Sequence, residues 1–106
     1  MTDKIVVFST ASSAEEAEKI ARGLVNDHLA ACVNVVPSVR SFYRWQGKIE
    51  DSAELLLVIK SSRERFEALR TSLEKLHSYE VPEVIAMPVV DGAQNYLNWM
   101  DGELGA

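Results

Sequence analysis

The chain has 106 residues, of which 47% are hydrophobic and 25% charged, with only 5 Gly and 3 Pro. This composition excludes a disordered or fibrous chain and fits a single domain over residues 1–106. The net charge of −5 disfavours nucleic acid as a partner. The single Cys excludes an intrachain disulfide, and no apolar run approaches the roughly 20 residues that cross a bilayer. Because the N-terminus has no signal-peptide pattern, we expect a cytoplasmic protein with no membrane partner.

The N-terminal quarter of the chain predicts a strand followed by a helix. Residues 5–9 form an apolar run typical of a buried strand. Ser12 and Ser13 each precede a Glu by three residues, which is capping-box spacing, and apolar residues then recur at helical period. We therefore expect a helix over about 13–27.

The central part of the chain predicts a long β-hairpin. Residues 30–46 are rich in β-branched and aromatic side chains, with an interruption at Pro37, and Gly47 offers a turn before the apolar run in 49–61. A turn centred on Gly47 pairs Val39 with Leu55 and Val35 with Ile59.

The remaining residues predict a helix, a strand and a final helix. The Ser61-x-x-Glu64 spacing predicts that the second helix opens there, and His77 ends it. A connector over 79–82 leads to a strand over 83–90, in which Pro88 indicates a sheet edge or a bulge. The last helix is expected over about 93–101. The order of elements predicts an α+β fold, namely a ferredoxin-like βαββαβ domain with an antiparallel sheet and a C-terminal helix.

The length of the hairpin predicts self-association. Residues 30–46 span about 55 Å when extended, whereas a domain of this size is only about 35 Å across. The hairpin must therefore bend at Pro37 or project, and the part that projects contains Phe42, Tyr43 and Trp45. Exposed aromatic side chains of this kind are typical of interfaces. We expect an obligate homo-oligomer, and this reasoning leaves both a dimer and a trimer open.

The motif inventory gives no sign of an enzyme. The sequence has no nucleotide-binding, hydrolase-elbow or Cys-x-x-Cys motif. Only Cys32, His28 and His77 are soft or borderline metal ligands, too few for a closed zinc site within one chain. Any strong metal site is therefore expected at a subunit boundary. Each candidate also has a structural interpretation, with Cys32 as a small core residue and His77 as a helix terminus.

Four segments, spread in order over essentially the whole chain, together resemble one known protein family. They are LAACVNVVP (29–37), SFYRWQGKI (41–49), LHSYEVPE (76–83) and YLNW (96–99). They resemble the CutA divalent-cation tolerance proteins. The resemblance implies a ferredoxin-like protomer, a homotrimer built through the long hairpin and a likeness to PII-type signal proteins. It also implies a role in tolerance of copper and other divalent cations, without an agreed catalytic activity.

The resemblance also directs attention to metal ligands. Where some relatives have a metal-binding Cys, this chain has Ser9, and where they have a His pair, it has Leu76 and His77. Our leading hypothesis is a non-enzymatic homotrimer that binds copper or another divalent metal ion at or between subunits. Its candidate ligands are His77, Glu83 and Cys32.

Three alternatives stay open at this stage. The first is a PII-like binding module for a small molecule or partner protein, with intersubunit clefts. The candidate cleft residues are Trp45, Glu54, Lys60, Tyr96 and Trp99. The second is acylphosphatase-like chemistry on the same fold, for which the sequence has no glycine-rich phosphate loop. The third is a purely structural trimer.

Overall fold

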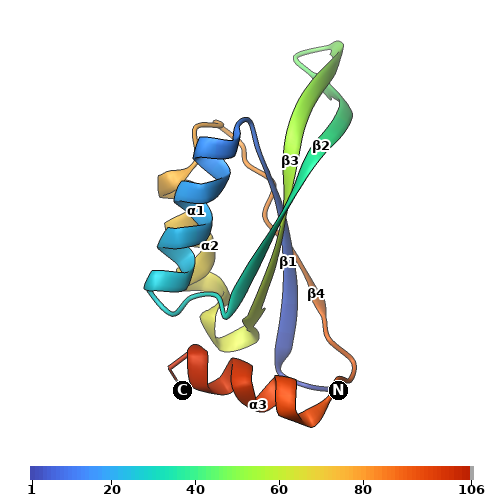
Figure 1. Cartoon of the computed structure of the whole chain (residues 1–106). Coiled ribbons are helices and arrows are strands. Elements are labelled where there is room, and N and C mark those ends of the chain that lie inside the picture. Colours follow the sequence, from blue (N-terminus) through green and yellow to red (C-terminus); the bar gives the residue numbers. More distant parts are fainter. Residues whose placement is uncertain (106) are drawn as a thin grey trace.

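Two helices pack on one face of a four-stranded antiparallel sheet in a computed structural model, which describes residues 1–105 (Figure 1). The elements in chain order are β1 (Lys4–Ala11), α1 (Ala14–Asn26), β2 (Cys32–Trp45), β3 (Lys48–Ser62), a 3₁₀ turn (Arg63–Arg65), α2 (Phe66–Leu76), β4 (Ile85–Pro88) and α3 (Gln94–Glu103). The strand order is β2-β3-β1-β4. This arrangement confirms the predicted ferredoxin-like α+β fold with a C-terminal helix.

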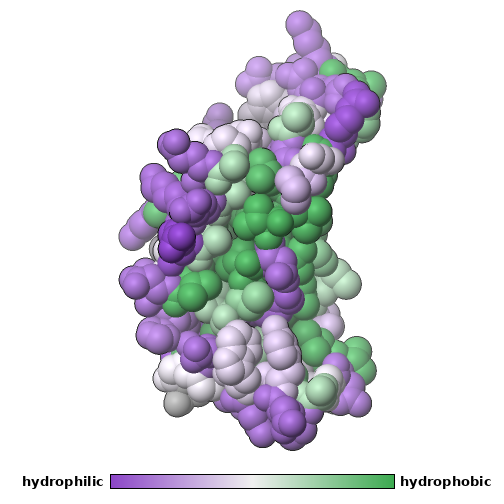
Figure 2. All heavy atoms as spheres, in the orientation of Figure 1, coloured by the Kyte–Doolittle hydropathy of each residue, from purple (hydrophilic) through white to green (hydrophobic). Residues whose placement is uncertain are grey.

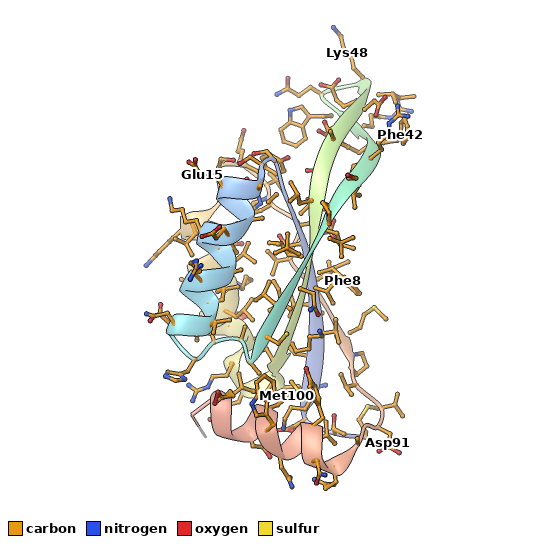
Figure 3. The ribbon with its side chains drawn as sticks, in the orientation of Figure 1. Phe8, Glu15, Phe42, Lys48, Asp91 and Met100 are labelled. Atoms are coloured by element: carbon orange, nitrogen blue, oxygen red, sulfur yellow. The ribbon has the colours of Figure 1, made fainter. Side chains whose placement is uncertain are left out.

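The core lies between the sheet and helices α1 and α2. Alternate residues of the two central strands point toward the helices, as the two-residue period of a strand requires. The fully buried core side chains include Val7, Leu57, Ile59, Ile20, Leu24, Leu69 and Leu73. Helix α3 lies across the end of the sheet, where Met100 is buried (Figure 3). Among residues 1–105, no helix is both long enough and apolar enough to span a membrane.

The hairpin of β2 and β3 projects beyond the rest of the sheet. The pairing of β1 with β3 ends at Ala11 and Leu55, so residues 48–54 of β3 pair only with β2. The protomer is consequently 44 Å long and only 25 by 23 Å in its other dimensions. Lys48 marks the tip in Figure 3. The hairpin both projects and is interrupted near Pro37, as its length predicted.

The predicted register of the hairpin was wrong. Val39 pairs with Glu54 rather than Leu55, and Val35 pairs with Leu57 rather than Ile59. The first difference arises because the turn has two residues, Gln46 and Gly47, instead of being centred on Gly47. The second difference is two residues, because a β-bulge between Val36 and Val39 inserts an extra residue into β2 and its shift adds to the shift at the turn.

The sheet face opposite the helices is also apolar. It contains Val6 and Phe8 of β1 and Leu56 and Val58 of β3, all partly exposed. The edge strands add Val36, Ile85 and Met87, which are exposed by 41%, 56% and 54%. Apolar side chains gather over the sheet in Figure 2, whereas the hairpin tip and the outer side of α1 are hydrophilic. The sheet therefore has two apolar faces, as the sequence indicated, and the helices cover one of them.

Three predicted boundaries needed correction. Ser61 does not cap α2, because it is buried in β3 and its hydroxyl donates to the Leu29 carbonyl at 2.6 Å. A 3₁₀ turn intervenes, and α2 begins only at Phe66. Strand β4 covers 85–88 rather than 83–90, and its place at the edge of the sheet agrees with Pro88.

Replacement by Ala should change the free energy of unfolding in opposite directions at Gly47 and Gly102, because the two glycines have different backbone conformations. Gly47 has a φ of +83°, whereas Gly102 lies in α3, and a Cβ atom added at either position would have no neighbour within 4 Å. Gly47→Ala should lower the free energy of unfolding by about 1 kcal/mol, because a side chain disfavours the left-handed region. Gly102→Ala should raise it by up to about 1 kcal/mol, because Gly weakens a helix. Chemical denaturation followed by circular dichroism measures both, and effects of the same sign would contradict the assigned turn.

Candidate binding cleft

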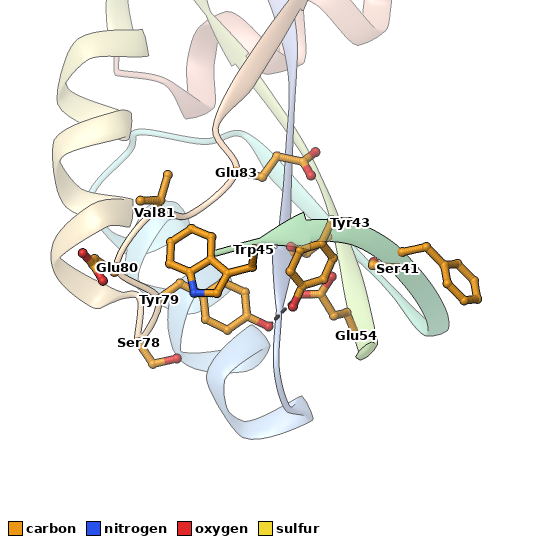
Figure 4. A pocket seen from close by; sticks show the side chains of 11 residues that line it. Ser41, Tyr43, Trp45, Glu54, Ser78, Tyr79, Glu80, Val81 and Glu83 are labelled. Atoms are coloured by element: carbon orange, nitrogen blue, oxygen red, sulfur yellow. Dashed lines mark hydrogen bonds between the residues drawn. The ribbon is translucent and has the colours of Figure 1, made fainter. Parts of the chain in front are cut away.

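A cleft of about 740 Å³ lies between the projecting hairpin and the connector that follows α2. Tyr43 and Trp45 of β2 and Glu54 of β3 line it from the hairpin. Tyr79 and Glu83 line it from the connector (Figure 4). A volume of this size is typical of a small-molecule site.

The β-bulge determines which hairpin side chains face the cleft. On the sheet side of the bulge, Val36 pairs with Leu56, and on the tip side Val39 pairs with Glu54. Residues paired across two strands share a face of the sheet. Because β3 continues without interruption, the extra residue in β2 reverses which β2 residues lie on the Glu54 face. As a result, Tyr43 and Trp45 lie on the Glu54 face.

Glu54 and Tyr79 form the central contact of the cleft. The Tyr79 hydroxyl donates a hydrogen bond of 2.6 Å to Glu54 Oε2, although the two residues come from different elements. Burial of Tyr79, reinforced by the Glu54 carboxylate, raises the pKa of the phenol, so the hydroxyl keeps its proton and remains a donor. Glu54 itself is only 6% exposed.

His77 positions the connector. Its side chain is fully buried. Its Nδ1 accepts a 3.0 Å hydrogen bond from the Tyr79 backbone N–H, and its Nε2 lies 2.6 Å from the Thr10 carbonyl oxygen. An N–H can only donate and a carbonyl can only accept, so these partners assign the proton to Nε2 of a neutral ring. The ring centroids of His77 and Tyr79 are 4.6 Å apart, so His77 orients both the backbone and the ring of Tyr79.

Glu16 fixes the connector from the opposite side. Its carboxylate accepts hydrogen bonds from the backbone N–H and hydroxyl of Ser12 at 3.0 Å and from the backbone N–H of Ser78 at 2.8 Å. Burial raises the pKa of Glu16, but these hydrogen bonds to its charged form outweigh burial and lower the pKa to about 2. The N-terminal end of α1 is thereby tied to a residue 62 positions later.

The structure brings together only some of the predicted cleft residues. Trp45 and Glu54 share the cleft. Lys60 lies farther along β3, where its Nζ is 4.0 Å from Cys32 Sγ and also contacts Asn34 Oδ1. Tyr96 and Trp99 lie on α3, with ring centroids 5.4 Å apart, at the end of the sheet opposite the hairpin tip (Figure 1).

The predicted metal ligands do not form a site within one protomer. His77 and Glu83 belong to the same connector, but both ring nitrogens of His77 already have backbone partners. Cys32 lies apart from them, beside Lys60. In the part of the chain that the structure describes, no three His, Cys, Asp or Glu side chains are grouped so that they could hold a metal ion. The described residues of a single protomer therefore do not fit a metal centre.

Sequence reasoning missed two contributors to this region. Tyr79 was interpreted only as part of a connector, and the pattern 77–83 gave no sign that its hydroxyl would meet Glu54. Glu16 was recognised by its capping-box spacing, which indicates a helix start but not a contact with Ser78. Both contacts join residues that are distant in the sequence, which local spacing cannot reveal.

Comparisons with known proteins find related sequences over nearly the whole chain. The sequence profile of a family described as CutA1 divalent ion tolerance protein matches residues 5–103. The divalent-cation tolerance protein CutA of Thermus thermophilus is 44% identical over 100 residues, which cover 94% of this chain and 97% of that protein. The chloroplastic protein CutA of Arabidopsis thaliana is 43% identical over 96 residues, which cover 91% of this chain and 53% of that protein.

Solved structures support the same relationship. The crystal structure of CutA from Xylella fastidiosa has a TM-score of 0.95 at 44% identity, covering 97% of this chain and 99% of that one. A structure from Archaeoglobus fulgidus, described as a periplasmic divalent cation tolerance protein CutA, has a TM-score of 0.93 at 39% identity. That match covers 95% of this chain and 98% of the other.

The low pKa of Glu16 predicts a pH-dependent contribution to stability. Because the pKa falls from 4.5 to about 2 on folding, the contribution is complete above about pH 4.5 and is lost as the pH falls through 2. Glu16→Gln should lower the free energy of unfolding by about 3 kcal/mol at pH 7, and this difference should shrink between pH 4.5 and 2. Denaturation at pH 7, 5 and 3 measures it. Glu15→Gln, in the same helical turn but exposed, is the control. A difference that does not change with pH would contradict the assignment.

Proposed function

Because the chain belongs to the CutA1 divalent ion tolerance family, we propose that it acts as a homotrimer that binds copper or other divalent metal ions at or between its subunits. In this proposal each protomer is one domain, residues 1–106, and the role is binding rather than catalysis. We also propose that the protein is cytoplasmic and has no nucleic-acid partner. Its relatives include proteins described as chloroplastic and as periplasmic, so location is a property of each member.

The open apolar face of the sheet is the observation that supports assembly. Its side chains, including Val36, Ile85 and Met87, are costly to leave in water, and the helices of the same protomer cover only the other face. The projecting hairpin adds Phe42, Tyr43 and Trp45, exposed by 65%, 42% and 41%. Closed threefold symmetry allows three copies to cover the same surfaces of one another.

The proposed metal sites lie where protomers meet, because residues 1–105 of one protomer do not group enough ligands. Glu83 is exposed and Cys32 is partly exposed, so both can meet a donor from another copy. His77 would join them only by giving up a hydrogen bond to Thr10 or Tyr79. A carboxylate and a thiolate together suit a range of divalent cations, including copper.

A second candidate function is a PII-like binding module for a small molecule. The cleft between the hairpin and the connector favours it, because aromatic walls and a few polar groups are typical of ligand sites. Trp45 and Glu54 line that cleft directly. Lys60, Tyr96 and Trp99 would contribute to it only from another protomer.

Native mass spectrometry tests the trimer. The wild-type protein should have three times the 11.8 kDa mass of the chain at micromolar concentration. Val36→Glu, on the open sheet face, should dissociate the assembly because it places a charge in an apolar interface. Val25→Glu, on α1, makes the same change at a side chain of similar exposure, 43% against 41%, and should leave the trimer intact. A monomeric wild type, or equal effects of the two variants, would refute the proposed interface.

Titration with Cu²⁺, followed by native mass spectrometry and calorimetry, tests the metal site. The wild-type trimer should bind copper, and Glu83→Gln or Cys32→Ser should weaken binding by about tenfold or more. Glu15→Gln, which removes an exposed carboxylate from α1, should have no effect. Wild-type affinity in His77→Gln would remove His77 from the ligand set, and no binding by the wild type would refute the metal proposal.

A further inference from the structure

We propose that Asp91 is a site of covalent modification, where the linkage between Asp91 and Gly92 rearranges through a cyclic imide into an isoaspartyl linkage. The product is a substrate for the class of repair enzyme that uses S-adenosylmethionine to methylate isoaspartyl carboxylates. The inference depends neither on metal binding nor on a ligand in the cleft, because it concerns one dipeptide in the loop between β4 and α3.

The rearrangement requires only these two residues and water. The Gly92 backbone nitrogen attacks Cγ of the protonated Asp91 carboxyl group, so an N–Cγ bond forms, a C–O bond breaks, and water leaves with the amide proton. Water then opens the five-membered ring. Attack at Cγ breaks the new bond and restores aspartate, whereas attack at the Asp91 backbone carbonyl breaks the original peptide bond. The second route gives isoaspartate, in which the main chain runs through Cβ and Cγ and the α-carboxylate is free.

Asp91 and Gly92 already have the arrangement that ring closure needs. The Gly92 N–H donates a 2.9 Å hydrogen bond to Asp91 Oδ1, so the carboxyl group lies against the nitrogen that attacks it. Residues 89–93 belong to neither a helix nor a strand, so the dihedral angles of Asp91 can change without breaking a regular element. Gly92 also has no Cβ atom to crowd its nitrogen.

The packing of α3 keeps glycine at position 92. A Cβ atom added to Gly92 would lie 3.2 Å from Leu97 Cδ2. Leu97 in turn packs against the buried side chains of Met100 and Leu104, which dock α3 on the end of the sheet. A larger residue at position 92 would slow the attack but would require Leu97 to shift. The fold therefore favours the reactive dipeptide at this position.

The same dipeptide occurs at Asp101 and Gly102 in an environment that opposes the reaction. Both residues lie in α3, where each side chain tilts toward the helix N-terminus and so away from the following amide nitrogen. The helical N–H of Gly102 points along the axis toward the carbonyl four residues earlier. Asp101 Oδ1 also lies 2.6 Å from the buried Lys4 Nζ, which holds the carboxylate charged and turned toward β1. The chain thus contains its own matched control.

The arrangement at Asp91 is internal to one chain. The hydrogen bond joins neighbouring residues, so it does not depend on which surfaces other copies cover. Asp91 also lies at the end of the sheet opposite the hairpin tip, which Lys48 marks (Figure 3). The experiments use the native assembly, so any cover by other copies is included in the result.

Incubation of the native assembly in water enriched in oxygen-18 tests the site. Each passage through the imide replaces one oxygen atom, because an unlabelled water leaves and a labelled one enters. Trypsin releases residues 76–106 as one peptide, since Lys75 is the last Lys or Arg, and fragmentation assigns the label to Asp91 or Asp101. Over several weeks at neutral pH, Asp91 should acquire the label and Asp101 should not. No label at Asp91, or equal labelling of both, would overturn the inference.

Two variants and an unfolded sample are the controls. Asp91→Glu retains the charge but requires a six-membered ring, so labelling at position 91 should fall by about tenfold or more. Asp101→Glu makes the same change in α3 and should leave Asp91 labelling at the wild-type rate. In guanidinium chloride both aspartates should acquire the label, because the helix and the Lys4 contact are lost. Wild-type labelling in Asp91→Glu, or no label at Asp101 after unfolding, would contradict the proposed cause.

Enzymatic methylation distinguishes the two products of ring opening. After incubation, the peptide 76–106 should accept a methyl group from S-adenosylmethionine in the presence of an isoaspartyl methyltransferase, and the methyl group should map to position 91. The same peptide from freshly prepared protein should accept none. Oxygen-18 uptake without methyl acceptance would show that hydrolysis returns only aspartate, and would refute the isoaspartyl product.

Discussion

The pairing of β2 with β3 beyond the end of β1 is the constraint from which the rest of the molecule follows. Over residues 48–54 the ribbon has no third strand, so its side chains have no core of their own to enter. A two-stranded ribbon is only marginally stable in water unless another surface supports it. Within the protomer that support comes from the connector, through the hydrogen bond between Tyr79 and Glu54. The cleft exists because an extended ribbon and a short connector meet at this point.

The connector can perform this role because it is fixed at both flanks. His77 bonds to β1 through Thr10, and Glu16 at the start of α1 bonds to Ser78. These contacts satisfy backbone groups that a loop would otherwise present to water or leave buried without a partner. Tyr79 follows directly, so its ring is oriented by a histidine and a carboxylate that do not themselves line the cleft. A residue that looks like a metal ligand in the sequence thus has a structural task within the protomer.

The sequence was informative wherever one local pattern determined the outcome. Pro37 indicated an interruption and Pro88 an edge, and both agree with the structure because proline cannot donate a ladder hydrogen bond. The continuous apolar run 55–59 indicated two apolar faces, because successive residues of a strand point to opposite faces of the sheet. Patterns failed where a tertiary contact determined the outcome. Ser61 has the spacing of a cap, yet its hydroxyl bonds to Leu29, and no local rule could pair Tyr79 with Glu54, 25 residues away.

The bulge between Val36 and Val39 has a consequence for how this ribbon can change during evolution. Because the inserted residue reverses side-chain alternation, the outer segment is out of phase with the inner one. Removing one residue there would restore the phase and exchange the two sides of the outer segment of β2, turning its aromatic rings away from the acidic residue they now accompany. Lineages could lengthen or shorten both arms beyond the bulge by matched pairs of residues and keep this arrangement, whereas an odd change in one arm would lose it.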